Sequence, residues 1–341
     1  MGDRYKAVLV GCGGICGTKV RASKARDDIE IIGLVDIDPA RVEKRAKDFE
    51  LEDAEQGTDL AKVLEKTKPD IVFDCTVPEA HASVTITALE HGCHVLGEKP
   101  LADTMENARK MIEASKKAGK VYAVTQNRRH LANIRALTKY LASGDIGGIT
   151  TVHSTFLVGA HFDGFRARMR HPLLLDMAIH SFDQARLIMG AEAKTAYCHE
   201  WNPSGSWYDH DGSAVAIFEM TGGAVYTYQG SWCSEGMNTS WECEWRVVCE
   251  NGSAVWDKGG VRAEKVADKS KFISEVTPVE IPVEELGEGK GGQFGVVDEF
   301  IAALNEGRDP ETVCTDNIKS LAMVHAAIDS AGKGCKVDVV V

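Results

Sequence analysis

The stretch that most constrains the fold runs from Lys6 to Gly17, with the sequence KAVLVGCGGICG. An apolar run, residues 7–10, leads directly into four glycines within seven residues, and residues 18–25 then favour the start of a helix. Asp36 stands at the end of a second apolar run, nineteen residues after Gly17. A strand, a glycine-rich turn, a helix and a strand that ends in an acid follow one another in dinucleotide-binding units. The segment therefore predicts such a unit rather than a plain strand-turn-helix.

Each part of this segment has a physical role. Gly11 allows the tight turn, and Gly13 lets the backbone approach a diphosphate. The helix that follows supplies free N–H groups and the positive end of its dipole. The third small position of G-x-G-x-x-G holds Cys16, which departs from the usual glycine or alanine but is still small. A phosphate-loop alternative fails, because it requires G-x-x-x-x-G-K-[ST] and Lys19 lies one place too late.

Asp36 also indicates which cofactor the turn would bind. A carboxylate at this position accepts hydrogen bonds from ribose hydroxyls and repels a 2′-phosphate. No arginine follows it directly, and Arg41 is the nearest cation in the sequence. We therefore expect NAD, with NADP less favoured.

Composition excludes several classes of protein. The chain has 341 residues, 44% hydrophobic and 26% charged, which suits two globular domains with cores of their own. A net charge of −12 argues against a nucleic-acid or anionic-membrane partner. The sequence shows no signal-peptide pattern and no apolar run that could span a bilayer. The ten cysteines are scattered without a C-x-x-C pair, so we expect free thiols and a cytoplasmic protein.

Cys12 and Cys16 lie beside the glycine turn, at a helix N-terminus where thiol pKa values tend to fall. A redox role is one interpretation of this position. The favoured interpretation is that both are small residues required by the turn.

Residues 5–124 alternate between short apolar runs and segments with helical periodicity. After Asp36 the expected strands are residues 70–77, 94–99 and 121–125, and the expected helices are residues 39–49, 58–66, 80–91 and 104–118. Strands separated by helices of this length predict a parallel sheet with helices on both faces. Ligands bind beyond the carboxyl ends of such strands, which places Gly11, Asp36 and residues 76–78, 98–99 and 126–128 along one edge.

The pattern changes after residue 126. The expected strands are residues 149–158, 193–201, 213–220, 224–232, 242–249 and 253–256, joined by short turns such as MTGGA and CENGS. One helix, residues 173–189, interrupts them, and two more, residues 294–305 and 316–331, close the chain. We predict an α/β protein: a doubly wound parallel Rossmann sheet in residues 1–126, then an α+β domain with a large, mainly antiparallel sheet in residues 127–341.

Four motifs, in this order, resemble those of the glucose-fructose oxidoreductase / inositol dehydrogenase family, Gfo/Idh/MocA. They are VGCGGIC at the first turn, GEKPLA at residues 97–102, QNRR at residues 126–129 and LLLDMAIHSFDQAR at residues 173–186. The resemblance runs almost end to end and implies a catalytic centre of Lys99, Asp176 and His180. Two departures are Ala178, where the family usually has glycine, and MRHP in place of a small, glycine-rich run before the last motif.

The same three residues fit alcohol oxidation on chemical grounds. Asp176 and His180 lie four residues apart on the predicted helix, so their side chains share one face. The residues around them are apolar, which argues against the alternative that this face is simply exposed to solvent. His180 is suited to general acid/base work near neutral pH. Lys99 could stabilise a developing alkoxide, and Asp176 could orient the imidazole or bind a neighbouring hydroxyl. A proton relay between Lys99 and His180 stays open. Asp183 is interpreted as structural.

The remaining site residues follow from the predicted edge and from the resemblance. The residues expected to bind the cofactor are Gly11, Gly13, Gly14, Ile15, Cys16, Asp36, Ile37, Thr76, Pro78, His81, Glu98, Lys99 and Gln126. The residues expected to contact the substrate are Lys99, Arg128, His161, Arg166, Asp176 and His180. The resemblance also suggests a cis peptide bond between Lys99 and Pro100. No metal is expected, because the histidines lack a recognised ligand spacing.

We therefore expect an NAD-dependent dehydrogenase or reductase for a secondary hydroxyl, or the ketone, of a sugar or cyclic polyol. One alternative is an enzyme that retains NAD and oxidises a glycoside transiently, so that elimination or hydrolysis can follow. Another is a non-enzymatic NAD-binding regulator, which would be expected to lose the lysine or the histidine. The resemblance implies a homodimer or homotetramer formed through the C-terminal sheet. The sequence names neither the sugar nor the carbon oxidised.

Overall fold

The computed structural model describes residues 4–341, which form two compact units. The first unit contains residues 4–130 and 287–318, and the second contains residues 131–286 and 319–341. These ranges differ from two continuous segments that meet at residue 126, because a late helical segment belongs to the first unit. The division into functional domains at residues 1–126 and 127–341 stays a prediction.

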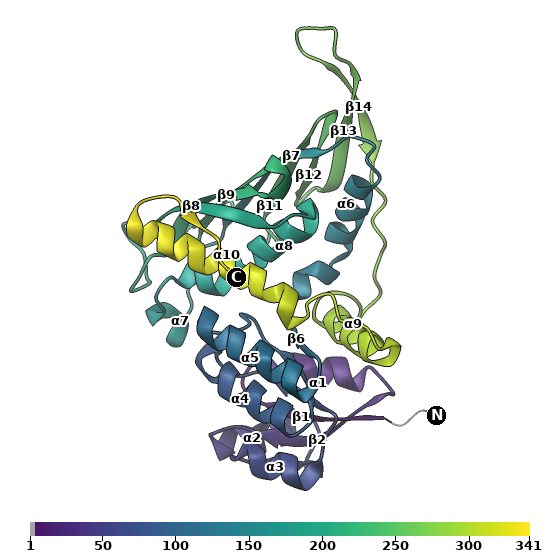
Figure 1. The fold of residues 1–341 in the computed structure, drawn as a ribbon, viewed down its shortest axis with the longest axis vertical. Coiled ribbons are helices and arrows are strands. Elements are labelled where there is room, and N and C mark those ends of the chain that lie inside the picture. The colour runs from purple at the N-terminus through teal and green to yellow at the C-terminus, as the bar shows by residue number, and fades with distance from the viewer. Residues whose placement is uncertain (1–3) are drawn as a thin grey trace. The chain divides into compact units, whose positions relative to one another are not determined.

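The first unit is built on a parallel sheet, as the sequence predicts, but the sheet has six strands because it includes β3, which the sequence does not predict (Figure 1). Its strands are β1 (Tyr5–Val10), β2 (Ile29–Val35), β3 (Glu55–Gly57), β4 (Ile71–Asp74), β5 (His94–Gly97) and β6 (Tyr122–Val124). They pair in the order β3-β2-β1-β4-β5-β6, and every pair is parallel. This is the strand order of a dinucleotide-binding Rossmann sheet, whose order reverses between β1 and β4.

Helices connect these strands and cover the sheet. They are α1 (Cys16–Lys24), α2 (Pro39–Asp48), α3 (Leu60–Thr67), α4 (Pro78–Glu90), α5 (Met105–Ala118), the 3₁₀ turn η1 (Asn127–His130) and α9 (Gly292–Glu306). Local sequence explains both ends of α5: the Thr104 side chain caps its N-terminus, and Gly119 ends the helix in the left-handed conformation. Leu9 of β1, Val20 of α1 and Phe300 of α9 belong to one buried cluster, which explains why α9 lies in this unit.

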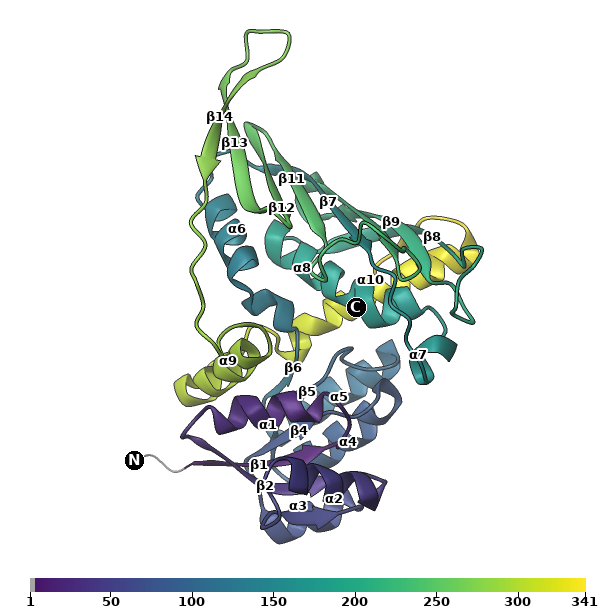
Figure 2. The same ribbon diagram turned by 180° about the vertical axis from the view of Figure 1, so that it is seen from behind.

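The second unit is built on a nine-stranded sheet, seen from both sides in Figures 1 and 2. Its strands are β7 (Ile149–Leu157), β8 (Ala193–Trp201), β9 (Ser213–Met220), β10 (Val225–Ser231), β11 (Glu244–Cys249), β12 (Gly252–Asp257), β13 (Gly260–Asp268), β14 (Glu275–Glu280) and β15 (Val337–Asp338). The order is β14-β13-β12-β11-β7-β10-β9-β8-β15. Only β7 and β10 pair in parallel, so the sheet is mainly antiparallel, as predicted.

Helices lie against one face of this sheet in both views (Figures 1 and 2). They are α6 (Ala132–Ala142), α8 (Ile179–Met189) and the part of α10 (Cys314–Lys333) that belongs to this unit. Short turns, α7 (Phe165–Arg168), the π-helical turn η2 (Leu173–Ala178) and the 3₁₀ turn η3 (Thr221–Gly223), complete the unit. The opposite face carries exposed apolar side chains, Tyr197, Trp201, Val215 and Ile217.

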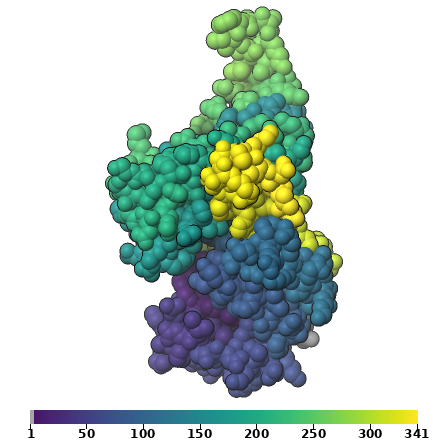
Figure 3. All heavy atoms as spheres, turned by 60° about the vertical axis from the view of Figure 1, so that its left-hand side comes forward, coloured from purple at the N-terminus to yellow at the C-terminus, as the bar shows by residue number. Residues whose placement is uncertain are grey.

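The hairpin of β13 and β14 extends away from the rest of the second unit (Figure 3). Two large apolar side chains on its connecting loop, Phe272 and Ile273, are exposed to solvent. Within residues 4–341, no helix combines the length and the apolar character that crossing a bilayer would require.

Candidate active site

The glycine turn after β1 has room for a ligand where the protein itself leaves a gap. Gly11 has φ +89°, and a Cβ there would lie 2.7 Å from the backbone carbonyl of Cys75, so only glycine fits. Gly13 and Gly14 differ, because a Cβ at either position would meet no protein atom within 4 Å. The space beside these two glycines can therefore admit another molecule.

The N-terminus of α1 borders this turn and is open to an anion. Ile15 occupies the N-cap position, and its side chain makes no capping hydrogen bond. The first turn of α1 contains no acidic residue. The first N–H groups of a helix lack partners within the helix and attract negative charge. The residues present therefore fit the diphosphate of a dinucleotide.

Asp36 is fixed beside the turn by backbone hydrogen bonds. Its Oδ2 accepts from the Cys12 N–H at 2.7 Å, and its Oδ1 accepts from the Asp38 N–H at 3.0 Å. Because each carboxylate oxygen has a further lone pair, both can still accept from a ribose hydroxyl. Ile37, the next residue, is 92% exposed.

Arg45 of α2 also contacts the turn, which the sequence analysis misses. Its guanidinium donates to the carbonyl of Gly13 at 2.7 Å and to that of Cys12 at 3.2 Å. The ring of Phe49 lies 5.5 Å from the same guanidinium. Only the fold reveals this contact, because nothing in the spacing from Asp36 to Arg45 distinguishes it from the other basic residues of α2.

The cysteines next to the turn are not activated. All ten cysteines of the chain are free thiols, as expected. Contact with the Cys16 thiol and burial raise the pKa of Cys12. For Cys16, contact with Cys12 acts to lower the pKa, but contact with Cys75 and burial outweigh it and the pKa rises. The expectation that this position lowers thiol pKa values is therefore wrong, because the thiols are buried against one another.

The end of β4 carries a buried hydrogen-bonded group. Asp74 accepts from the Thr76 N–H at 3.0 Å and from the Thr76 hydroxyl at 2.5 Å, and its other oxygen lies 3.0 Å from Nδ1 of His81. Burial acts to lower the pKa of His81, but the nearby carboxylates, chiefly Asp74, outweigh it and raise the pKa. Pro78 is the first residue of α4. This group gives the loop after β4 a defined shape at the predicted edge.

The ends of β5 and β6 carry the next predicted residues. Glu98 follows β5 directly and is buried, and the peptide bond between Lys99 and Pro100 is cis. Gln126 lies two residues beyond β6 and is only 1% exposed. Neither Nε2 nor Oε1 of its side-chain amide has a hydrogen-bond partner. Arg128, in the 3₁₀ turn that follows, is buried as well.

The predicted pair on the second unit lies where a π-helical turn becomes an α-helix. Asp176 belongs to η2, and His180 is the second residue of α8. Oδ2 of Asp176 accepts a hydrogen bond from Nε of Arg166 at 2.9 Å. Arg166 lies over the rings of Phe162 and Phe165, 5.3 and 4.7 Å from their centroids. The structure therefore brings two predicted residues, Arg166 and Asp176, into one ion pair.

His161 has different neighbours. Its ring stacks on Trp207 with centroids 3.6 Å apart, and its Nε2 lies 2.9 Å from a carboxylate oxygen of Glu235. The side chain is still exposed. These contacts hold the His161 ring against Trp207 and Glu235.

A partly buried ion pair, which the sequence does not predict, anchors the segment before η2. Nδ1 of His171, a residue with φ +54°, lies 2.6 Å from Oε2 of Glu200 in β8. The Glu200 carboxylate raises the pKa of His171 against the opposing effect of burial. Burial raises the pKa of Glu200, although His171 acts to lower it. This pair ties the start of the predicted catalytic segment to the sheet.

We expect the contribution of this pair to folding stability to fall as the pH rises through neutrality. A histidine whose pKa is raised above 6.5 in the folded state stabilises the fold fully below that value, and the stabilisation is lost as the pH passes the raised pKa. The free energy of unfolding should be measured for the wild type and for His171→Asn, which tolerates the positive φ. The difference should be larger near pH 6 than near pH 8.5. A constant difference would mean that the pKa of His171 is the same in the folded and the unfolded protein, which would contradict the prediction.

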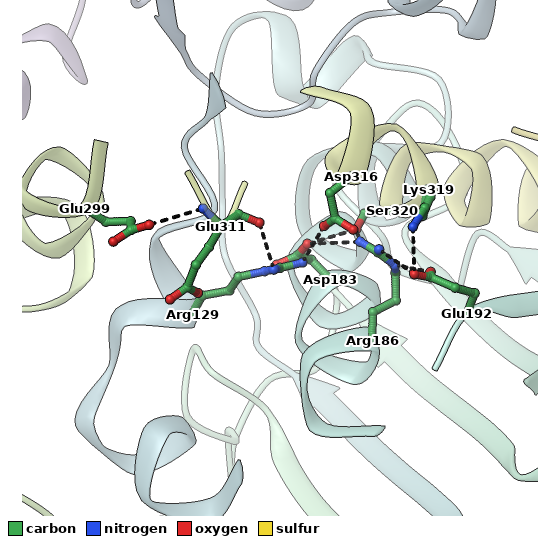
Figure 4. A network of polar contacts seen from close by, with 9 residues as sticks. All are labelled: Arg129, Asp183, Arg186, Glu192, Glu299, Glu311, Asp316, Lys319 and Ser320. Atoms are coloured by element: carbon green, nitrogen blue, oxygen red, sulfur yellow. Dashed lines mark hydrogen bonds and ion pairs between the residues drawn. The ribbon is translucent and has the colours of Figure 1, made fainter. Parts of the chain in front are cut away.

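Asp183, interpreted as structural, lies in a buried network within the second unit (Figure 4). Ser320 donates to Asp183 at 2.8 Å and accepts from Arg186 at 2.9 Å. Arg186 also makes two hydrogen bonds to Glu192, of 2.7 and 3.0 Å, and Lys319 pairs with the same carboxylate. These contacts join α8 to α10.

Figure 4 also shows a polar group of the first unit. Arg129 donates to the Glu311 carbonyl at 3.2 Å and pairs with Asp316 at 3.3 Å, and the Glu311 N–H donates to Glu299. The group joins η1 to the segments around α9. Among residues 4–341, no set of three or more His, Cys, Asp or Glu side chains is arranged to hold a metal ion.

Comparisons with known proteins agree with this fold. Residues 5–126 match the family described as "Oxidoreductase family, NAD-binding Rossmann fold", and residues 134–255 match the "GFO/IDH/MocA C-terminal domain". The "Uncharacterized protein y4oX" of Sinorhizobium fredii is 27% identical over 98% of this chain and 96% of its own length. The D-apiose dehydrogenase of Paraburkholderia graminis is 26% identical over 98% of this chain and 90% of its own length.

A solved structure is similar in fold over nearly the whole chain. It is an oxidoreductase from Agrobacterium radiobacter in complex with NAD⁺, L-tartaric acid and magnesium. The TM-score is 0.87 with 23% identity, and the match covers 98% of both chains. Both units of this chain therefore have the fold of an oxidoreductase that has been solved with NAD⁺.

Proposed function

Because this chain belongs to the Gfo/Idh/MocA oxidoreductase family and has its NAD-binding Rossmann domain, we propose that it is an NAD-dependent dehydrogenase or reductase. Its substrate would be a secondary hydroxyl, or the corresponding ketone, of a sugar or cyclic polyol. The name of the relative from Paraburkholderia graminis, a D-apiose dehydrogenase, supports a sugar substrate.

The observation that carries this proposal is the open glycine turn beside an uncapped helix. The diphosphate would lie at Gly13, Gly14 and the first N–H groups of α1, where the protein leaves room and supplies no capping side chain. Asp36 would accept hydrogen bonds from the adenine ribose, which favours NAD over NADP. The unpaired, buried amide of Gln126 would gain partners from the same molecule. Thr76, Pro78 and His81 would shape the edge beside it.

The chemistry requires a hydride acceptor, a proton acceptor and a positive charge near the reacting oxygen. NAD, when bound, supplies the hydride acceptor. In the oxidation, the His180 imidazole would take the hydroxyl proton, because its ordinary pKa lies near neutrality. The Lys99 ammonium would donate a hydrogen bond to the reacting oxygen and stabilise its developing negative charge. In the reverse direction both would act on the carbonyl oxygen. The proximity of Lys99 to His180 that this requires stays a prediction.

Asp176 would act as an ionised carboxylate. A guanidinium 2.9 Å away stabilises the charged form, which accepts hydrogen bonds but donates none. Asp176 would therefore accept either from the His180 ring or from a second hydroxyl of the substrate. Arg166 would hold Asp176 in position, and its contact with Phe162 and Phe165 limits where its guanidinium can lie.

We also propose that the protein is a homodimer or homotetramer. Tyr197, Trp201, Val215 and Ile217 are exposed on the face of the nine-stranded sheet that helices leave open. An apolar face of this kind is typical of protein interfaces. A second copy of the chain would cover it.

A screen for NAD reduction tests the proposed function. Purified protein would be assayed with inositols, aldoses, anhydrosugars and glycosides, with NAD and NADP in parallel. We expect NADH to accumulate with at least one polyol or sugar, and NADPH to form more slowly. Cleavage of a glycoside without net NAD consumption would favour the NAD-retaining alternative. Binding of NAD without turnover of any compound would favour a regulator and contradict the proposal.

A further inference from the structure

Lys19 of α1 is a fully buried lysine whose ammonium group is satisfied by three different segments of the chain. Its Nζ lies 3.0 Å from Oε1 of Glu98, 2.8 Å from Oγ1 of Thr125 and 3.2 Å from Oε1 of Gln293. The ammonium donates hydrogen bonds to Thr125 and Gln293, and the Glu98 carboxylate neutralises its charge in an ion pair that lacks hydrogen-bond geometry. Lysine is almost never fully buried unless it is paired, which makes this arrangement a specific one.

Two of these partners directly precede residues of the predicted site. Glu98 comes immediately before Lys99, and Thr125 comes immediately before Gln126. They follow neighbouring parallel strands: Gly97 at the end of β5 pairs with Val124 at the end of β6. The Thr125 N–H also donates to the Gly97 carbonyl at 2.8 Å. One ammonium group therefore holds together the two strand ends from which Lys99 and Gln126 extend.

We propose that Lys19 is a positioning residue, which fixes the backbone that carries Lys99 and Gln126 without touching cofactor or substrate itself. This inference rests on the proposed function for the role of those two residues. Its physical basis is twofold. The ammonium pins the Glu98 and Thr125 side chains at fixed distances from α1, and it neutralises a buried carboxylate next to Lys99. Without it, the Glu98 carboxylate would be free to attract the Lys99 ammonium.

The test compares Lys19→Met with the double variant Lys19→Met/Glu98→Gln and with Glu98→Gln alone, which shows what the loss of Glu98, an expected cofactor contact, does to kcat by itself. Methionine keeps the length and apolar stem of lysine but removes the ammonium, which leaves the Glu98 charge buried alone and lowers the melting temperature. The double variant removes that lone charge as well. Lys24→Met is the matched control, because Lys24 belongs to the same helix but bonds only to the exposed Phe49–Glu50 turn.

With a substrate from the screen, we expect Lys19→Met to lower kcat by about 10²-fold with little change in KM, as small misplacements of reacting groups do. The double variant should recover the melting temperature but not kcat. Lys24→Met should match the wild type in both. Recovery of kcat together with the melting temperature would show that Lys19 is only structural and would overturn the inference, as would an unchanged kcat in Lys19→Met.

Hydrogen exchange gives a readout that does not depend on activity. In Lys19→Met and in the double variant, the backbone amides at residues 97–99 and 124–128 should exchange faster than in the wild type, whereas those of β1 should not. Exchange unchanged at both strand ends would overturn the inference. If the wild type reduces NAD with no compound, the proposed function fails, and the exchange data still decide whether Lys19 fixes these segments.

Discussion

Replacing Lys99 with alanine should abolish turnover and leave the affinity for NAD nearly unchanged. Removing one electrostatic contact to a developing oxyanion typically lowers kcat by about 10²–10³-fold. Lys99 is among the residues expected to contact the cofactor, but the groups proposed to hold the diphosphate and the ribose are Gly13, the N-terminus of α1 and Asp36. The variant should therefore lose turnover while it still binds NAD. The measurements are the dissociation constant for NAD from titration calorimetry and kcat from NADH formation.

Two further variants sharpen this result. Lys117→Ala removes an exposed lysine of α5 in the same unit, so it should match the wild type and control for loss of surface charge. Lys99→Arg keeps the positive charge but presents it on a planar, longer group, so it should restore only part of kcat. Unchanged turnover in Lys99→Ala would contradict the assigned role. A large loss of NAD affinity would instead show that Lys99 supplies much of the binding energy for the cofactor.

The first unit could be predicted well because its strands are buried on both faces. Such strands are continuous apolar runs between helical segments, and their ends mark the edge where ligands bind. β1 and β4 are examples, since every residue of β4 is buried. The Rossmann order follows from the same alternation. What the pattern cannot show is that α9, far along the chain, packs with α1 through Phe300 and Val20.

The strands that the sequence analysis misses have one face in solvent or lie at an edge. β13 alternates apolar and charged residues, and β14 contains Pro278 and is exposed along most of its length. A proline is tolerated there because β14 is an edge strand, but in the sequence it argues against any strand. The parallel pairing of β7 with β10 is also hidden, because short turns predict antiparallel neighbours and these two strands are far apart in the chain.

The residues of the candidate site likewise include some that the sequence could identify and some that it could not. Gly11, Asp36 and Lys99 could be identified from spacing and motif. Arg45, the His171–Glu200 pair and Lys19 could not, because each acts through a partner distant in the sequence. Lys19 is the clearest case. A lysine in the first turns of a helix normally faces solvent, and only the fold brings Glu98, Thr125 and Gln293 to its ammonium group.

Two glycine-to-alanine substitutions in the turn after β1, at Gly11 and at Gly13, should have opposite effects on folding. Gly11→Ala should prevent stable folding, because it forces alanine into φ +89° and sets its Cβ 2.7 Å from the Cys75 carbonyl. Backbone strain alone costs about 1–3 kcal/mol, before the clash is counted. Gly13→Ala should fold normally, since its Cβ meets no protein atom within 4 Å. Melting temperatures measured by calorimetry should separate the two variants, with Gly332→Ala as a control at another open glycine.

Gly13→Ala should nevertheless lose affinity for NAD. The added methyl group would occupy the space through which the backbone approaches the diphosphate, and a tenfold weaker dissociation constant, equivalent to about 1.4 kcal/mol, is the smallest effect we expect. Because this variant keeps its fold, weaker binding would report on the ligand and not on stability. If Gly13→Ala bound NAD as tightly as the wild type, the diphosphate could not lie at this turn, and the proposed cofactor site would be wrong. If Gly11→Ala were as stable as Gly13→Ala, the turn would have to adopt another conformation in solution.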